Sequence, residues 1–158
     1  NLESGTARVL AQHNVSVTPT LDTRYFLNMH LDDPGIPDVI RSRAQASASA
    51  HERSVAYSNA LEAGVTVTAG TDSGTTFVPH GALATEIRLM HEGGLSVRQA
   101  LASATWLAAA ELGLPGELGT LAAGAYADLL VLESNPLEDL AALEHIAMVI
   151  QSGTLLAR

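Results

Sequence analysis

Apolar and polar residues alternate in two short segments of the first half of the chain, residues 15–18 and 65–69. The first segment is Val-Ser-Val-Thr and the second is Val-Thr-Val-Thr-Ala. In both, Val occupies every second position and most of the remaining residues are β-branched Thr. This pattern favours β-strands. Because each segment follows a stretch with helical periodicity, the order of elements indicates an α/β arrangement.

Apolar residues spaced three or four apart predict helices at residues 3–12, 38–63, 82–92 and 97–112. The longest of these has a single apolar stripe, formed by Ile40, Ala44, Ala48, His51 and Val55. Gly64 follows it as a typical C-terminal glycine. The last should form two short helices or one kinked helix, opened by a capping box of Ser96 and Gln99. Residues 22–37, rich in turn-forming residues, are expected to be a long loop.

The pattern changes after Pro115-Gly116, where glycines become frequent and the apolar runs become short. Three of these runs predict strands, at residues 127–132, 147–151 and 154–157. Ser152-Gly153 is expected to form the turn between the last two strands. We therefore divide the chain into a βα-like part, residues 1–114, and a mainly β part, residues 115–158.

Length and charge limit what such a chain can do. Its 158 residues are too few for a complete (β/α)₈ barrel, which needs about 250. The net charge is −9 and all eight basic residues are Arg, so we expect neither a nucleic acid nor a membrane as partner. Without Cys or Lys, the chain has no thiolate metal site, Schiff-base lysine or P-loop. The sequence begins at Asn1 with neither Met nor a signal-peptide pattern, so we expect a cytoplasmic protein of which this is a piece.

Asp72 is the leading candidate for a catalytic residue. It follows the predicted strand 65–69 and lies in a turn with Gly70 and Gly74 on either side. Active sites of parallel α/β folds form at the carboxyl ends of strands, where a carboxylate can bind a metal or accept a proton from metal-bound water. The alternative is an Asp that only stabilises the turn or caps the next helix, and spacing alone favours this structural role.

His80 is a second candidate, because it lies in the loop after Asp72, between Pro79 and Gly81. It can contact a substrate from there, or serve only as a surface or capping residue. The chain has six histidines without a spacing typical of metal ligands, and His51 is expected to pack within its helix stripe. Residues 72–75, Asp-Ser-Gly-Thr, also match the aspartic protease motif, but those proteins are nearly all β and this chain is rich in predicted helices.

Three stretches together resemble the metal-dependent amidohydrolase superfamily, in particular its imidazolonepropionase-like and Xaa-Pro or Xaa-Arg dipeptidase-like branches. The first stretch is Gly-Val-Thr-Val-Thr-Ala-Gly-Thr-Asp-Ser-Gly at 64–74, followed by Val-Pro-His-Gly at 78–81. The second includes Gly-Leu-Ser at 94–96 and Ala-Thr at 104–105. The third runs from Leu-Gly-Thr-Leu at 118–121 to Asn-Pro-Leu at 135–137. One departure is Tyr126, where the family usually has Lys.

The resemblance implies the C-terminal portion of a TIM-like (β/α)₈ barrel, residues 1–114, plus strands of a composite β-sandwich, residues 115–158. It implies a metal-dependent hydrolase of C–N bonds in a cyclic amide or small peptide, with one or two zinc ions. Asp72 would be a metal ligand and exchange protons with the attacking hydroxide, and His80 would contact the substrate. The implied partner is the N-terminal part of the barrel, and a homo-oligomer is possible.

The family's other metal ligands are absent from this chain. They come from the first, middle, fifth and sixth barrel strands, which the sequence does not include. A catalytic zinc typically has about three protein ligands. The alternative hypothesis is therefore a fragment or module that is not catalytic as it stands.

Overall fold

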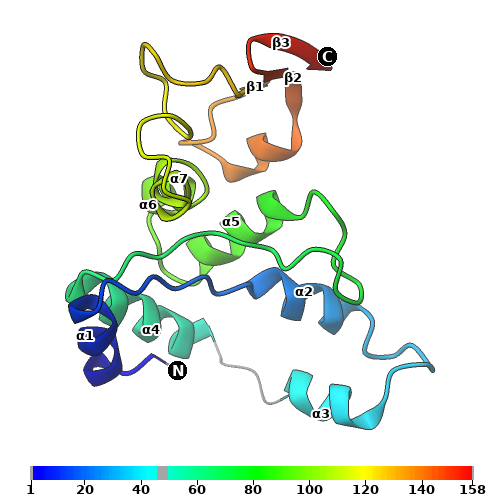
Figure 1. Ribbon diagram of the computed structural model, residues 1–158. Coiled ribbons are helices and arrows are strands. Elements are labelled where there is room, and N and C mark those ends of the chain that lie inside the picture. Colours follow the sequence, from blue (N-terminus) through cyan, green and yellow to red (C-terminus); the bar gives the residue numbers. More distant parts are fainter. Residues whose placement is uncertain (1, 46–49, 158) are drawn as a thin grey trace.

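The computed structural model describes residues 2–45 and 50–157, together with their side chains except those of residues 43–45, 50 and 51. In this part of the chain there are seven α-helices, one 3₁₀ helix and three β-strands (Figure 1). The helices are α1 (Ser4–Gln12), α2 (Leu21–Met29), α3 (Asp38–Gln45), α4 (Ala50–Ala63), α5 (Leu83–Glu92), α6 (Val97–Ser103) and α7 (Trp106–Glu111). The strands are β1 (Leu129–Leu132), β2 (Ile146–Gln151) and β3 (Thr154–Ala157), with the 3₁₀ helix η1 (Leu140–Glu144) between β1 and β2.

The two alternating segments of the first half lie side by side and run parallel, but a single bridge between Val17 and Val67 joins them. The Val17 N–H donates to the Thr66 carbonyl at 2.9 Å, and the Thr68 N–H donates to the Val17 carbonyl at 3.0 Å. The prediction of two strands is therefore correct only in part. The pairing ends after Thr18 because Pro19 has no N–H, and the Ala69 N–H donates to the Ser103 carbonyl instead.

Helix α2 corrects the prediction that residues 22–37 form a loop, since its helical residues extend to Met29. The turn-forming residues after it do form the expected irregular connection to α3. Thr20, at the N-cap position, makes no side-chain capping bond. The cap comes instead from Glu86, whose Oε2 accepts the Asp22 N–H at 2.8 Å across 64 positions of sequence. The sequence around α2 cannot indicate a capping partner that lies so far away in the chain.

The remaining helices follow the sequence prediction more closely. The segment expected as one helix over 38–63 begins with α3 at Asp38 and ends with α4 at Ala63. Of its predicted apolar stripe, Ala48 and the side chains of Ala44 and His51 lie outside the described part of the chain. Residues 97–112 divide into α6 and α7, as expected. Ser96 accepts the Gln99 N–H at 3.3 Å and the Gln99 side chain accepts the Ser96 N–H at 2.8 Å, which confirms the capping box.

The three strands form an antiparallel sheet in the order β1-β2-β3. Leu130 lies opposite Val149, and Ile150 lies opposite Leu155. Ser152 and Gly153 join β2 to β3 with φ of +48° and +77°, the combination that two-residue hairpins favour. All four residues of β3 are exposed, so this edge of the sheet has no covering element within the described residues.

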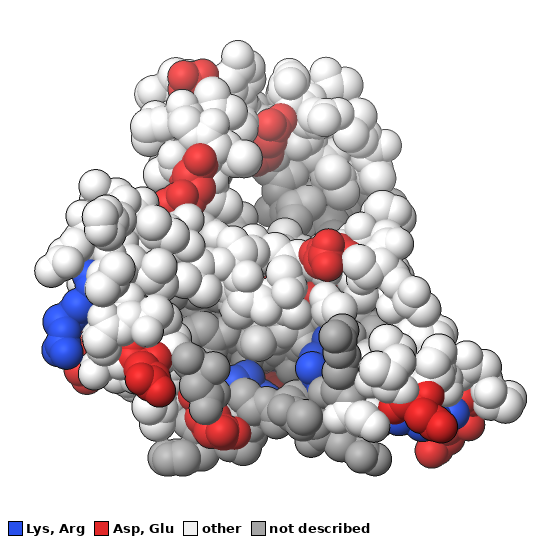
Figure 2. Space-filling model, turned by 60° about the horizontal axis from the view of Figure 1, so that its bottom comes forward, with Lys and Arg blue, Asp and Glu red and all other residues white. Residues whose placement is uncertain are grey.

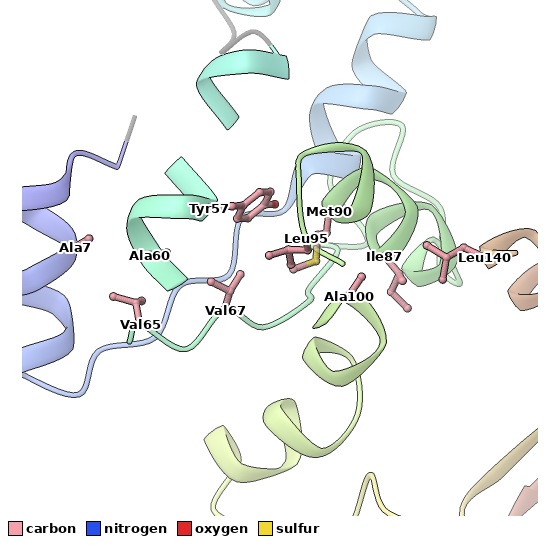
Figure 3. Packing of buried hydrophobic residues seen from close by; sticks show 10 residues of the cluster. All are labelled: Ala7, Tyr57, Ala60, Val65, Val67, Ile87, Met90, Leu95, Ala100 and Leu140. Carbon is pink, nitrogen blue, oxygen red and sulfur yellow. The ribbon is translucent and has the colours of Figure 1, made fainter. Parts of the chain in front are cut away.

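The hydrophobic core lies between the paired segments and helices α1, α4, α5 and α6 (Figure 3). Met90 of α5 is its largest fully buried apolar side chain, and Val67 and Leu95 are buried in the same cluster. Leu140 of η1 joins this cluster and connects the C-terminal part to α5. Figure 1 shows the sheet at one end, with α5 between it and helices α1, α2 and α4.

Within the described ranges, none of the helices has the length and hydropathy needed to cross a lipid bilayer.

Replacing Met90 with Ala should lower the free energy of unfolding by about 2–5 kcal/mol, because the buried side chain would leave a cavity that the neighbouring helices cannot fill. Met29→Ala is the matched control, since the Met29 side chain is 66% exposed, and it should change stability by less than about 0.5 kcal/mol. Urea unfolding followed by circular dichroism measures both. Equal effects of the two variants would contradict this description of the core.

Candidate functional site

Asp72 lies in the turn that follows the second paired segment. The pair is held together there by its side chains, because Thr18 Oγ1 and Thr68 Oγ1 are 2.8 Å apart and share a hydrogen bond. Asp72 adopts a φ of +49°, a left-handed conformation that Asp tolerates better than most residues. Its side chain is exposed at the carboxyl end of the parallel pair.

The Asp72 carboxylate has no hydrogen-bond partner among the described residues. The backbone carbonyl of Asp72, not its side chain, accepts the Thr75 N–H at 3.3 Å. The carboxylate therefore neither closes an Asx turn nor caps a helix in this structure. It is left available to a proton, a cation or a ligand, while its catalytic role stays a prediction.

The loop after Asp72 is held by its own hydrogen bonds. Thr71 Oγ1 and Ser73 Oγ are 2.6 Å apart, and Ser73 Oγ donates to the Pro79 carbonyl at 3.2 Å. Val78 is buried and anchors the loop from within. His80 belongs to the same loop and is exposed, but no hydrogen bond or ion pair joins it to Asp72 within the described part of the chain. Its contact with a substrate therefore also remains a prediction.

A buried pair of carboxyl groups lies close to this turn, and the sequence analysis missed it. Asp22 of α2 and Glu86 of α5 are both 0% exposed. Glu86 Oε2 accepts the Asp22 N–H, and Asp22 Oδ1 accepts the Thr23 N–H at 2.9 Å. The other two oxygens, Asp22 Oδ2 and Glu86 Oε1, are buried without an N–H or O–H partner among the described residues. The two side chains interact directly, so a proton on one carboxyl group would let it donate a hydrogen bond to the other.

The electrostatics of the pair favour a protonated Glu86. Burial, followed by the negative charge of Asp22 and the hydrogen bond with its side chain, raises the pKa of Glu86 to about 7, although the Leu21 and Asp22 N–H groups lower it. Burial also raises the pKa of Asp22, while hydrogen bonds from Thr23 and Glu86 lower it. The charge of Asp72 adds to the rise for Asp22, which shows that the candidate residue and the buried pair act on each other through space.

Tyr57 of α4 belongs to the buried core cluster (Figure 3) and interacts electrostatically with Glu86. Its hydroxyl is buried without a partner among the described residues, and burial raises its pKa, with the negative charge of Glu86 adding to the effect. One signal in the sequence was available for Glu86. It lies four positions before the buried Met90 and next to the buried Ile87, so it interrupts the apolar face of its own helix.

The described residues contain no group of three or more His, Asp or Glu side chains placed to hold a metal ion. Asp72 fits as a single oxygen ligand, whereas a catalytic zinc typically has about three protein ligands. Figure 2 shows separate acidic groups and fewer basic ones on the face turned forward, with broad uncharged surface between them. The described basic residues on this face form no continuous stripe of the kind that binds nucleic acid.

The buried pair should make stability depend on pH. The pKa of Glu86 rises on folding from 4.5 to about 7, so folding favours its protonated form. Its contribution is fully present below pH 4.5 and is lost as the pH rises to about 7, by about 3 kcal/mol at roughly 1.4 kcal/mol per pKa unit. Glu86→Gln should remove this dependence, because Gln resembles the protonated acid and does not titrate.

Urea unfolding at a series of pH values between 4.5 and 8 measures this effect. Glu62→Gln, on the exposed surface of α4, is the control and should keep the pH dependence of the unchanged protein. If Glu86→Gln also keeps it, the proton of the pair does not reside on Glu86.

Three comparisons place the chain among known proteins. The model of the amidohydrolase family matches residues 1–156. An uncharacterised protein of Mycobacterium tuberculosis (strain ATCC 25618 / H37Rv) is 33% identical over 158 residues, which cover 96% of this chain and 39% of the relative. Ochratoxinase of Aspergillus niger is 37% identical over 120 residues, which cover 75% of this chain and 24% of that enzyme.

Among solved structures, an Xaa-Pro dipeptidase with methionine bound in its active site superposes with a TM-score of 0.85 at 28% identity. The superposition covers 99% of this chain and 38% of the dipeptidase. The chain thus spans about two fifths of the length of the first relatives that it matches. The family match covers nearly every residue. The mixture of helices with one small antiparallel sheet is unlike the nearly all-β aspartic proteases, so the interpretation of residues 72–75 as an aspartic protease motif is wrong. The chain belongs to the amidohydrolase family.

Proposed function

We propose that this chain is the C-terminal part of a metal-dependent amidohydrolase that hydrolyses C–N bonds in small peptides or cyclic amides. The observation that carries the proposal is the Asp72 carboxylate, exposed at the carboxyl end of the parallel pair without a protein partner among the described residues. A carboxylate with a purely structural role would be expected to accept a hydrogen bond from the turn or from the next helix. In this fold, the same position is where active sites form.

The rest of the barrel would come from residues outside this chain. The paired segments around Val17 and Val67 would be its last two strands, and their single bridge is what a barrel edge without its neighbours would show. The sheet β1–β3 would be part of a composite sandwich. Leu130, Leu155 and Leu156 are exposed on it, which supports a covering layer supplied by other residues.

Asp72 would hold one zinc ion through its carboxylate, together with ligands from outside the described residues. A zinc ion in such a site supplies Lewis-acid activation of water. Asp72 would accept the proton of the attacking water and later return it to the leaving nitrogen, as a general base and then a general acid. His80 would contact the substrate from the loop that Asp72 begins.

The name of a related protein, an Xaa-Pro dipeptidase, supports a small substrate. The similar Xaa-Pro dipeptidase has methionine in its active site, which supports a dipeptide or amino acid derivative as the substrate here. The net charge of −9 supports a small substrate over nucleic acid or an anionic membrane as partner. A cytoplasmic location and a homo-oligomer remain predictions.

A second candidate is that the chain alone is a module without catalytic activity. The observation that favours it is that the described residues offer no cluster of three or more metal-ligating side chains. Zinc analysis of the full-length protein with and without Asp72→Asn separates the two ideas, because a module outside the catalytic centre would leave the zinc content unchanged, whereas a zinc ligand would not.

Asp72→Asn in the full-length protein that carries this chain should lower kcat for dipeptide hydrolysis by about 10²–10⁴-fold or more, because Asn cannot accept the proton from water. KM should change less, since other residues would make most substrate contacts. Circular dichroism should stay the same, because the carboxylate makes no hydrogen bond within the described residues. Steady-state kinetics with zinc content measured in both proteins is the test.

Asp32→Asn is the matched control, since Asp32 is exposed in the connection after α2. It should keep both kcat and metal content. Full kcat at full metal occupancy in Asp72→Asn would show that Asp72 is only a turn residue.

A further inference from the structure

A cavity of about 600 Å³ lies between α2, the connection to α3 and the loop after Asp72. We call it the α2–α3 pocket. Its apolar wall is formed by Leu27, Ile36, Ile40 and Phe77. Small-molecule sites have volumes of about 300–1,000 Å³ and mainly apolar walls, and this pocket has both properties.

Two walls of the pocket come directly after the two paired segments in the sequence, as Asp72 does. Helix α2 begins soon after the first paired segment ends, and residues 75–77 of the pocket wall begin three positions after Asp72. Both walls therefore follow the carboxyl ends of the two parallel segments. In barrel enzymes the loops at this edge contact the substrate.

The pocket wall is held in place by specific contacts. The ring of His30, at the end of α2, stacks on the ring of Phe77, with centroids 4.2 Å apart and planes 11° apart. His30 Nδ1 is 2.9 Å from Asp33 Oδ2, and the Arg41 guanidinium donates to the Asp33 carbonyl at 2.7 Å. These contacts join α2, its connection to α3 and the loop after Asp72 around the pocket.

Phe77 itself has a φ of +73°, a conformation that bulky residues rarely adopt. Such strain persists only where the surroundings enforce it, and it is concentrated at ligand-binding and catalytic sites. Strain at a ring that lines a cavity is thus an observation independent of the cavity's size, and it also points to a ligand.

We propose that the α2–α3 pocket binds a neutral apolar side group of the substrate, on one side of the C–N bond that the enzyme cleaves. This inference rests on the proposed function, because the bound group is part of a substrate only if the protein is a hydrolase of C–N bonds. The four apolar side chains remove such a group from water, which strengthens binding by about fourfold for each methylene buried. Asp33, which also lines the pocket, repels a carboxylate, and the apolar wall disfavours a charged group of either sign.

The first test is binding, which does not depend on turnover. The probes are N-acetyl-L-phenylalaninamide and N-acetylglycinamide, titrated into the full-length protein and followed by NMR. We expect the phenylalanine probe to bind at least about tenfold more tightly than the glycine probe. Probes with lysine or glutamate side chains should bind no better than glycine. Equal binding of all probes, or tighter binding of a charged one, would overturn the proposal.

Two variants locate the binding. Leu27→Ala removes part of the apolar wall, and Thr76→Trp fills the cavity from an exposed position where a large side chain should not disturb folding. Each should weaken binding of the phenylalanine probe by about tenfold. Leu121→Ala is the matched control, since Leu121 is 89% exposed and outside the pocket. Unchanged binding in Thr76→Trp would place the probe elsewhere and overturn the proposal.

Turnover then distinguishes this inference from the proposed function. A series of dipeptides that differ in one side chain should show kcat/KM rising with its apolar size. Thr76→Trp should abolish that rise, and Leu121→Ala should keep it. If dipeptides are cleaved without any dependence on the pocket variants, the pocket inference fails and the proposed function stands. If the probes bind as expected but no dipeptide or cyclic amide is cleaved, the proposed function fails, and with it the assignment of the bound group as part of a substrate.

Discussion

The hydrogen bond from the N-terminus of α2 to the buried carboxyl group of Glu86 is the interaction on which the candidate site depends. Helix α2 has no side-chain cap of its own, so its first N–H groups need this partner. Glu86 lies on α5, the helix that follows the Asp72 loop. One buried side chain therefore fixes the element before the site to the element after it. Moving Glu86 would displace one wall of the α2–α3 pocket relative to Asp72.

The same pair couples the scaffold to the site electrostatically. Two buried carboxyl groups cannot both be ionised without a large desolvation penalty, and a single proton on Glu86 removes most of it. The charge of Asp72 also adds to the rise in the pKa of Asp22, although burial has the largest effect.

The sequence predicted those features whose causes lie within a few residues. The capping box at Ser96, the break between α6 and α7 and the hairpin at Ser152-Gly153 all depend on neighbours in the chain, and all are present. The strand and turn pattern placed Asp72 after the second paired segment, where the structure has it, while its catalytic role remains a prediction. Helix α2 was missed because its cap lies 64 positions away. The pocket was missed because three separate segments form it. The two predicted strands are reduced to one bridge because Pro19 has no N–H to continue the pairing and the Ala69 N–H donates to the Ser103 carbonyl.

The distribution of positive φ angles also indicates that the functional edge is the carboxyl end of the paired segments. Among the described residues, the non-glycine residues with positive φ are Asn14, Thr20, Asp72, Phe77 and Ser152. Asn14 and Ser152 lie in turns that suit this conformation. The other three are a β-branched residue, the candidate catalytic Asp and an aromatic residue, and all three follow the carboxyl ends of the paired segments. For Thr20 and Phe77 this conformation costs about 1–3 kcal/mol each, and such strain is concentrated at ligand-binding and catalytic sites. The strain, the unpaired Asp72 carboxylate and the apolar pocket are three separate observations, and they coincide at this edge.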